Sequence, residues 1–277
     1  MQTLDIICKF CGSGKHIVRY GTYKGIQRYF CRNCERKFSD TDSPEKMRYP
    51  SVQISSAITM FYEGMSESMI QRHLQQVYGT KPSTGTIHEW IVKYTKQAIN
   101  KLDRYVAKTC NTWIADETVL QIGGYNVWFW DIIDDKSRFL LASHISFTRT
   151  TKHAETFLLK AFNHADCTPD IIITDKLNVY LQAVSNIFGK NTKHLTSKGF
   201  TVQPNTNMIE RFHSTLKFRT KIMRGLKSIE TAQLFLDGWL IHYNFFRPHS
   251  SLKGRTPAEV ARIEFPYKSW SDIVNFI

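Results

Sequence analysis

Three acidic residues, Asp116, Asp175 and Glu210, have surroundings that could support metal-dependent chemistry. Asp116 lies in the apolar and β-branched segment 112–118, where an ionised acid is costly unless it is paired or binds a metal. Asp175 directly follows the apolar run 171–174, and open α/β sheets collect their ligands at the ends of such strands. Glu210 lies on a predicted helix. Sparse carboxylate ligation suits Mg²⁺ or Mn²⁺, and two such ions about 3.5–4 Å apart can promote displacement at a phosphodiester.

Each of these acids also has an ordinary structural interpretation. Asp116 could be hydrogen-bonded at a strand end, Asp175 could cap the helix that follows it, and Glu210 could be a solvated helix residue. Competing acids lie nearby: Glu117, Asp131, Asp134 and Asp135. In a regular strand Glu117 should point away from the face that carries Asp116. The acids at 134–135 fall in a predicted turn, where acids are common.

A basic segment follows Glu210. From Arg211 to Lys227 there are six basic residues and no acidic one. Such residues on a helix could hold the phosphates of DNA beside an acidic centre. The residues that we expect to contact DNA are Lys217, Arg219, Lys221 and Arg224. The alternative is a basic helix that only keeps the protein in solution.

Four cysteines form a second candidate metal site. The pairs Cys8-x-x-Cys11 and Cys31-x-x-Cys34 are separated by 19 residues. Each pair can place two thiolates on a tight turn, and two pairs make a tetrahedral site that suits structural Zn²⁺. Zinc binding releases roughly 10–16 kcal/mol, enough to fold a unit of about 40 residues that lacks a large core. Buried or disulfide-bonded cysteines are the alternative.

The chain divides into three predicted domains: a zinc ribbon at 1–45, a helical domain at 46–108 and an α/β domain at 109–277. The polar, proline-containing stretch 39–44 is typical of a linker. Basic and aromatic residues alternate around the cysteines of the first domain. This pattern suits contact with a DNA backbone, and a merely solvated surface is the alternative.

The second domain has the pattern of three helices. Apolar residues recur at helical spacing from about 49 to 64 and from 66 to 77, and Gly64 and Gly79 end these helices. Ser83 is a good N-cap for a third helix. The last two helices resemble a helix-turn-helix whose second helix would read DNA. Three-helix units also occur as plain scaffolds.

The third domain changes in character. Residues rich in β-branched and aromatic side chains predict strands at 112–122, 125–133 and 139–147, with turns at 123–124 and 134–137. The elements predicted after them are a helix at 152–163, a strand at 171–174 and helices at 177–188, 206–223 and 229–246. A meander of three strands followed by alternating helices and strands predicts an α/β domain with one mixed sheet.

The charge of the chain favours a polyanionic partner. There are 37 Lys and Arg residues against 24 Asp and Glu residues, a formal net charge of +13. This surplus points first to nucleic acid and second to an anionic membrane. The sequence has no apolar run of bilayer-spanning length and no signal-peptide pattern near Met1. We therefore expect a cytoplasmic, nucleoid-associated protein that binds DNA and no membrane.

Together these residues resemble a known family. Asp116, Asp175 and Glu210, with 58 and 34 intervening residues, resemble the DDE triad of insertion-sequence transposases in the retroviral-integrase superfamily. Segments similar to the family's motifs are 113–118, 131–138, 174–176, 207–211, 243–249 and 252–257. The similarity covers about 110–262, and the arrangement most resembles insertion-sequence family six, in which a zinc ribbon and a helix-turn-helix can precede the core. Lys217 matches the basic residue that the family places near DNA.

The resemblance implies a ribonuclease H-like core and the activity of a DNA transposase. The N-terminal domains would bind the terminal inverted repeats of an insertion sequence. Metal-dependent hydrolysis would cleave at its 3′ ends, and each freed 3′-hydroxyl would attack target DNA by transesterification. Asp116, Asp175 and Glu210 would be the catalytic metal ligands. Because two ends are handled together, we expect a homodimer or a larger assembly on double-stranded DNA.

Two other functions are compatible with the same residues. A non-catalytic DNA-binding regulator would use only the zinc ribbon and the helix-turn-helix, and retention of all three acids argues against it. A structure-selective nuclease of the same fold would hydrolyse DNA without strand transfer, so joined products would exclude it.

Overall fold

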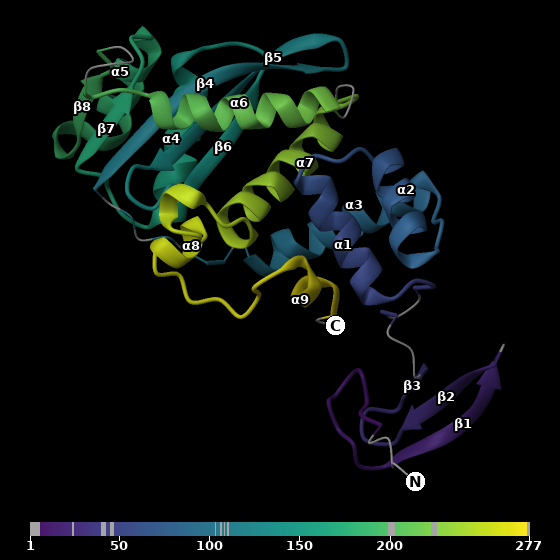
Figure 1. Cartoon of the computed structure of the whole chain (residues 1–277). Helices are drawn as coiled ribbons and strands as arrows, with labels where there is room; N and C mark the ends of the chain where they lie inside the picture. The colour runs from purple at the N-terminus through teal and green to yellow at the C-terminus, as the bar shows by residue number, and fades with distance from the viewer. Residues whose placement is uncertain are drawn as a thin grey trace.

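The structure, a computed structural model, contains two hydrophobic cores. A small core lies in the N-terminal strands, and a large one runs from the helices that follow through the C-terminal sheet. Figure 1 shows these helices and strands. The described residues are 6–23, 25–39, 43–44, 47–102, 104–105, 107, 109, 111–198, 203–222 and 226–275. Within these ranges, no helix combines the length and the apolar character that crossing a bilayer requires.

The N-terminal unit is an antiparallel sheet of β1 (Ile17–Tyr23), β2 (Ile26–Cys31) and β3 (Arg36–Ser39). The Tyr29 ring of β2 stacks on the Phe38 ring of β3 with 5.6 Å between the ring centroids. Besides these two rings, the buried residues of this core are cysteines. Such a small core needs a covalent or metal link to be stable alone.

Three helices follow, close to the predicted ranges: α1 (Ser51–Tyr62), α2 (Glu67–Tyr78) and α3 (Thr84–Leu102). The Ser66 hydroxyl caps α2 by accepting a backbone N–H, and Gly79 ends α2 in the left-handed conformation, with φ of 66°. Each of these helices packs against the other two. The sequence pattern therefore predicted a three-helix unit correctly.

The C-terminal sheet is mixed, as predicted. Its strands are β4 (Thr112–Ile122), β5 (Tyr125–Asp134), β6 (Leu140–Ser146), β7 (Ile171–Thr174) and β8 (Lys193–Thr196). The spatial order is β6-β5-β4-β7-β8, in which β4 to β6 are antiparallel and β4, β7 and β8 are parallel. This arrangement places β4 at the centre, next to the end of β7.

The hairpin between β4 and β5 turns on Gly123 and Gly124. Both have positive φ, 60° and 85°, which a two-residue hairpin of the favoured twist requires. The Gly123 N–H donates to the Leu226 carbonyl at 2.7 Å. This bond ties the tip of the hairpin to the chain between two later helices.

Helices cover both faces of the sheet. The Trp130 ring of β5 packs against α4 (Thr151–Ala165) and α5 (Asn178–Phe188). The next residue, Asp131, contacts α6 (Asn207–Ile222), which lies across the sheet in Figure 1. Because successive side chains of a strand point to opposite faces, α6 and the α4–α5 pair are on opposite sides.

The C-terminal part returns to the helical unit. Its elements are α7 (Ile229–Ile241), a π-helical turn (His242–Phe246), α8 (Pro257–Val260) and α9 (Trp270–Asn275). Helix α7 packs on α3, and α9 packs on α1. The Trp270 ring stacks on the Tyr62 ring at 5.2 Å. The helical unit and the α/β unit therefore share one continuous core.

The π-helical turn also fixes one edge of the sheet. The Asn244 side chain accepts from the Leu140 N–H at 2.9 Å and donates to the Leu140 carbonyl at 3.0 Å. Both side-chain groups of this buried amide thus pair with the backbone of Leu140, which satisfies the first residue of the β6 edge without another strand.

Candidate active site and cysteine cluster

Carboxylates from two parallel strands converge at the open edge of β4. Oxygens of Asp116, Glu117 and Asp175 lie within 4.8 Å of one another. Pairing of β4 with β7 runs from Thr112 to Ile114, and β7 ends just before Asp175. The next part of β4 therefore has no paired strand on the β7 side within the described residues, and its side chains can turn around this edge toward Asp175. The structure brings Asp116 and Asp175 together, with Glu117 as a third acid.

Glu117 points toward α5, the face opposite Asp116, yet its carboxylate reaches the same edge. Its Oε2 accepts from the Tyr180 hydroxyl at 2.8 Å, and its Oε1 accepts from Arg149 at 3.0 Å. Both oxygens of Glu117 are thus held by donors of the protein. The sequence pattern indicated the face correctly but did not show that Glu117 joins the cluster.

Asp175 joins the acidic cluster, as expected, but it does not cap α5, whose N-cap position is Leu177 and which has no side-chain cap. Its Oδ1 accepts from the backbone N–H of Leu177 at 2.9 Å, at the start of α5. The same carboxylate lies in the acidic cluster. The bond to Leu177 fixes the side chain, and this orientation brings it toward β4.

His213 on α6 links two acids of the sheet. Its Nε2 lies 2.8 Å from Oδ2 of Asp131, and its Nδ1 lies 3.6 Å from Oδ2 of Asp116. Asp116 and Asp131 are direct partners in the β4–β5 ladder. From the sequence we interpreted Asp131 only as an acid that competes with the proposed triad, and we assigned no role to His213. The available signal was that His213 follows Glu210 by three residues and so shares its helical face.

Glu210 lies in the first turn of α6, one turn before His213. Its Oε1 accepts from the Thr206 hydroxyl at 2.7 Å. Its carboxylate is not in the compact group of Asp116, Glu117 and Asp175. Glu210 therefore lies on the helix that contacts Asp116, with its side chain bound to its own helix terminus.

The electrostatics of the cluster favour a cation. Burial raises the pKa of Asp116 to about 7; His213 opposes this shift, and the carboxylates of Glu117 and Asp175 add to it. Burial also raises the pKa of Glu117, and that of Asp131 to about 6. Negative charge here is thus poorly compensated by the protein. Hard oxygen ligands with excess negative charge fit a divalent ion such as Mg²⁺.

The predicted DNA contacts on α6 separate into two groups. Lys217 and Lys221 are exposed. Arg219 is only 5% exposed; it donates to Glu63 at 3.1 Å and lies over the Trp239 ring at 4.8 Å. The prediction that Arg219 contacts DNA is therefore wrong, because its guanidinium is buried against α1 and α7. Arg224 lies outside the described residues.

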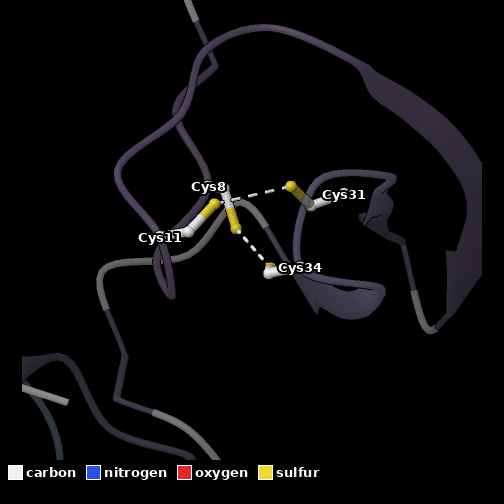
Figure 2. A group of neighbouring side chains, drawn as sticks. All are labelled: Cys8, Cys11, Cys31 and Cys34. Carbon is white, nitrogen blue, oxygen red and sulfur yellow. Dashed lines mark hydrogen bonds between the residues drawn. The ribbon is translucent and has the colours of Figure 1, made fainter.

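The four N-terminal cysteines converge on one point (Figure 2). The Sγ atoms of Cys8 and Cys34 are 3.6 Å apart, and those of Cys11 and Cys31 are 3.7 Å apart. All four thiols are free. A tetrahedral Zn²⁺ with Zn–S bonds of about 2.3 Å needs sulfurs separated by about 3.8 Å. The spacing is therefore too long for disulfides and fits a zinc ion.

Hydrogen bonds to Cys8 and Cys11 favour thiolates, whereas burial and the neighbouring thiols raise the pKa of Cys34. The Phe10 N–H donates to Cys8 at 3.5 Å, and the Asn33 amide donates to Cys11 at 3.6 Å. A hydrogen bond from the backbone of Ser13, together with that of Asn33, lowers the pKa of Cys11 to about 6. Since the thiolate is the form that ligates metals, this environment also fits a metal site.

Residues 110–249, about half of the chain, match the family model described as a DDE domain, of the IS240 transposase type. No curated protein matches the chain. A chain of the simian T-cell lymphotropic virus intasome in complex with PP2A regulatory subunit B56 gamma has 17% identity and a TM-score of 0.43. That match covers 60% of this chain and 59% of the intasome chain, less than two thirds of its length.

Two integrase cores are similar over a shorter part. The HTLV-2 integrase catalytic core domain in complex with magnesium has 16% identity and a TM-score of 0.42, over 55% of this chain and 95% of that chain. The BIV integrase catalytic core domain has 18% identity and a TM-score of 0.41, over 55% and 93%. The family match itself spans both β4 and β7, which carry the acidic cluster, and α6. The chain therefore belongs to the DDE-domain family of insertion-sequence transposases.

Proposed function

We propose that this protein is a transposase that binds the terminal inverted repeats of an insertion sequence, cleaves at the 3′ ends and joins them to target DNA. One observation carries the proposal: Asp116 and Asp175, distant in sequence, converge in the segment that matches the DDE domain. Helix α6, which carries Glu210, lies against them through His213. A carboxylate site beside an exposed basic helix is what cleavage of a polyanion requires.

Asp116, Asp175 and Glu210 would hold Mg²⁺ or Mn²⁺. When bound, the divalent ions supply Lewis-acid stabilisation of the charge that develops on the phosphodiester oxygens. His213, held by its hydrogen bond to Asp131, lies 3.6 Å from Asp116 and would help to orient this ligand. Both oxygens of Glu117 are already bonded to protein donors. This occupancy favours Glu210 over Glu117 as the third ligand, although Glu117 lies nearer in the structure.

The remaining parts of the chain would bind DNA and pair the two ends. The exposed Lys217 and Lys221 on α6 would contact phosphates beside the acids. Helices α2 and α3 would act as a helix-turn-helix, with α3 as the reader. The cysteine cluster would hold a structural zinc that takes no part in catalysis. Because both ends of an element must be processed together, a homodimer or larger assembly would form on DNA, and the protein would work at the nucleoid.

The experiment uses labelled duplexes that carry the repeats flanking the coding sequence, incubated with the full chain and Mg²⁺ or Mn²⁺. Wild-type protein should produce nicked and then joined strands. Asp116→Asn, Asp175→Asn and Glu210→Gln should each lower the rate by roughly a hundredfold or more, because metal ligation is lost. Asp166→Asn is the matched control, since Asp166 is an exposed acid at the end of α4. Wild-type nicking by Asp116→Asn would refute the assignment.

The products also separate the competing functions. Binding without cleavage under either metal would favour a DNA-binding regulator. Hydrolysis without joined strands would favour a nuclease of the same fold. Joined products that depend on all three acids would support the transposase.

A further inference from the structure

A cavity lies next to the acidic cluster on the α6 side of the sheet. Its volume is about 290 Å³, at the lower end of the size of small-molecule pockets. Ile114 of β4, Ile173 of β7 and Met208 of α6 form its apolar part. Arg138, from the turn between β5 and β6, and Arg211 of α6 contribute guanidinium groups. The proposed catalytic steps leave this cavity without a role.

The position of the cavity relates it directly to the acids. Ile114 and Ile173 are partners in the β4–β7 ladder. They precede Asp116 and Asp175 by two residues each, so they share the face of those acids at a distance of roughly 7 Å along the strands. Arg211 directly follows Glu210 in α6. A DNA strand whose phosphodiester lies at the acids would therefore pass the mouth of the cavity.

The chemistry of the lining suits a flat heteroaromatic group. The buried side chains of Ile114 and Ile173, with Met208, offer apolar surface against which the faces of a ring can pack. Planar guanidinium groups match the hydrogen-bond acceptors on the edge of a base. The Asp135 carboxylate also lines the cavity and interacts electrostatically with Arg138. Within the described part of the chain, however, neither Arg138 nor Arg211 forms a close ion pair or a hydrogen bond through its side chain, so both can donate to a ligand.

A third polar group points to the same kind of ligand. The Asn205 side chain also lines the cavity, and its Oδ1 accepts from the Asn207 N–H at 3.2 Å, which fixes the amide. An oriented amide beside two guanidinium groups resembles the polar lining that proteins use to read base edges. A phosphate would gain nothing from the apolar walls, since it remains hydrated.

We propose that this cavity accepts one base of the processed DNA strand, turned out of the stack beside the scissile phosphodiester. The inference rests on the proposed function, because it needs DNA at the acidic cluster. Such a site would hold the strand in register, and it would make cleavage depend on the presence of that base. The contribution of the cavity would therefore disappear when the base is absent and the backbone is intact.

The test combines protein variants with abasic DNA. The probes are the duplexes with flanking repeats, either intact or with a single tetrahydrofuran abasic site at each of the positions around the cleaved bond. Arg211→Ala and Arg138→Gly remove one guanidinium each. Arg138 has φ of 60°, a conformation that glycine adopts freely, so this substitution should preserve the turn. Lys217→Ala, on the same helix, serves as the control for a phosphate contact.

We expect Arg211→Ala and Arg138→Gly to weaken binding of intact DNA by roughly tenfold. At one abasic position the wild-type protein should also bind about tenfold more weakly than it binds intact DNA. On that abasic duplex, Arg211→Ala and Arg138→Gly should bind no more weakly than the wild-type protein. Lys217→Ala should weaken binding of intact and abasic DNA by the same factor. Equal losses on every duplex would mean a backbone contact, and an absence of loss on intact DNA would mean no contact; either result overturns the inference.

Cleavage of the same duplexes distinguishes the two proposals. Suppose that wild-type protein cleaves and joins intact DNA, but each variant loses the same factor in binding on abasic DNA as on intact DNA. Then only the inference about the cavity fails. If wild-type protein cleaves none of the duplexes, the proposed function fails and the inference fails with it.

Discussion

The imidazole of His213 lies between Asp131 and Asp116, with Nε2 2.8 Å from one carboxylate and Nδ1 3.6 Å from the other. Asp131 is fully buried, and its second oxygen has no hydrogen-bond partner among the described residues. Its charge therefore depends on His213. The pair connects α6 to the centre of the sheet, and it holds the imidazole beside Asp116 at the edge where the acids meet.

Loss of this pair should weaken the metal site without removing a ligand. We expect His213→Ala and Asp131→Asn to lower DNA cleavage by about 10–100-fold, as for other residues that orient metal ligands. The Mg²⁺ concentration for half-maximal rate should rise in both variants. His213→Gln retains a side-chain donor toward Asp131 and should recover part of the loss. A purely structural role would lower stability and leave the Mg²⁺ dependence unchanged, so a titration with Mg²⁺ decides between the two.

Lys217 and Arg219 should behave differently although both are basic residues of α6. Lys217 is exposed, so Lys217→Ala should lower DNA affinity and reduce the slope of log affinity against log salt by about one. Arg219 is buried and bonded to Glu63, so Arg219→Ala should lower the free energy of unfolding by about 2 kcal/mol. DNA binding at several salt concentrations and urea unfolding measure the two effects. A changed salt slope in folded Arg219→Ala would restore Arg219 as a DNA contact.

His242 should make the fold sensitive to acid. Its Nδ1 accepts from the Trp270 indole at 3.1 Å, and its Nε2 donates to Glu63 at 2.9 Å, so one proton on Nε2 satisfies both partners. A second proton on Nδ1 would face the indole N–H. Burial lowers the pKa of His242 below 6.5, so the unfolded chain binds this proton first as the pH falls. Stability from this group is complete above pH 6.5 and declines below it.

A second decline should follow at lower pH. The hydrogen bond from His242 holds the pKa of Glu63 at about 2, below its usual value of 4.5. Its stabilising effect is therefore present above pH 4.5 and is lost as the pH falls toward 2. Urea unfolding from pH 8 to 3 should show both phases. His242→Gln should reduce the first decline, leaving the parts due to His144, His194 and His249, whose pKa values burial also lowers. An unchanged profile for His242→Gln would contradict this explanation.

The cysteine cluster should hold one zinc ion per chain. Cys8→Ser and Cys31→Ser should abolish zinc binding and unfold the β1–β3 unit, because its core is too small to fold without the metal. Elemental analysis and NMR of the full chain would measure both effects. Asp116→Asn should keep its zinc, since its site is separate. A folded β1–β3 unit in the zinc-free wild-type protein would disprove a structural role for the metal.

The sequence predicted the elements that have strong local patterns. The strands at 112–122 and 171–174 have the predicted bounds, because β-branched runs end at clear turn or polar residues. Strand β8, at 193–196, was missed because it is a short, partly exposed strand with a single strongly apolar residue, Leu195. Helix α9 was missed because its packing on α1 brings together segments about 200 residues apart, which local periodicity cannot show.

The residues of the site also divide into those that the sequence could place and those that it could not. Asp116 and Asp175 could be placed from their strands alone. The contact between His213 and Asp131 could not, because it depends on the register of β4 and β5 and on where α6 crosses them. The burial of Arg219, by contrast, could have been predicted from the sequence. This residue continues the buried stripe of Ile209, Phe212 and Leu216 at helical spacing, so periodicity contained a signal that its side chain points inward.

Gly238 should be indispensable where α7 crosses the helical unit. A Cβ atom there would lie 2.6 Å from Thr95 Cγ2 and would overlap the hydroxyl of Tyr62, which is hydrogen-bonded to Thr95 at 2.7 Å. Gly238→Ala should therefore push α7 away from α1 and α3 and lower the free energy of unfolding by about 1–3 kcal/mol. The helix propensity of alanine, worth about 1 kcal/mol, would offset part of this loss.

Gly85 of α3 provides the matched control, because a Cβ there would meet only the Ser83 hydroxyl at 3.8 Å, an ordinary contact. Gly85→Ala should leave stability unchanged or raise it by up to about 1 kcal/mol. Thermal and urea unfolding of the two variants compare the same substitution in two helices. Since helix propensity acts in the same direction at both positions, a lower stability of Gly238→Ala alone must come from the packing of α7 on Tyr62 and Thr95. Equal effects at the two positions would show that this interface tolerates displacement.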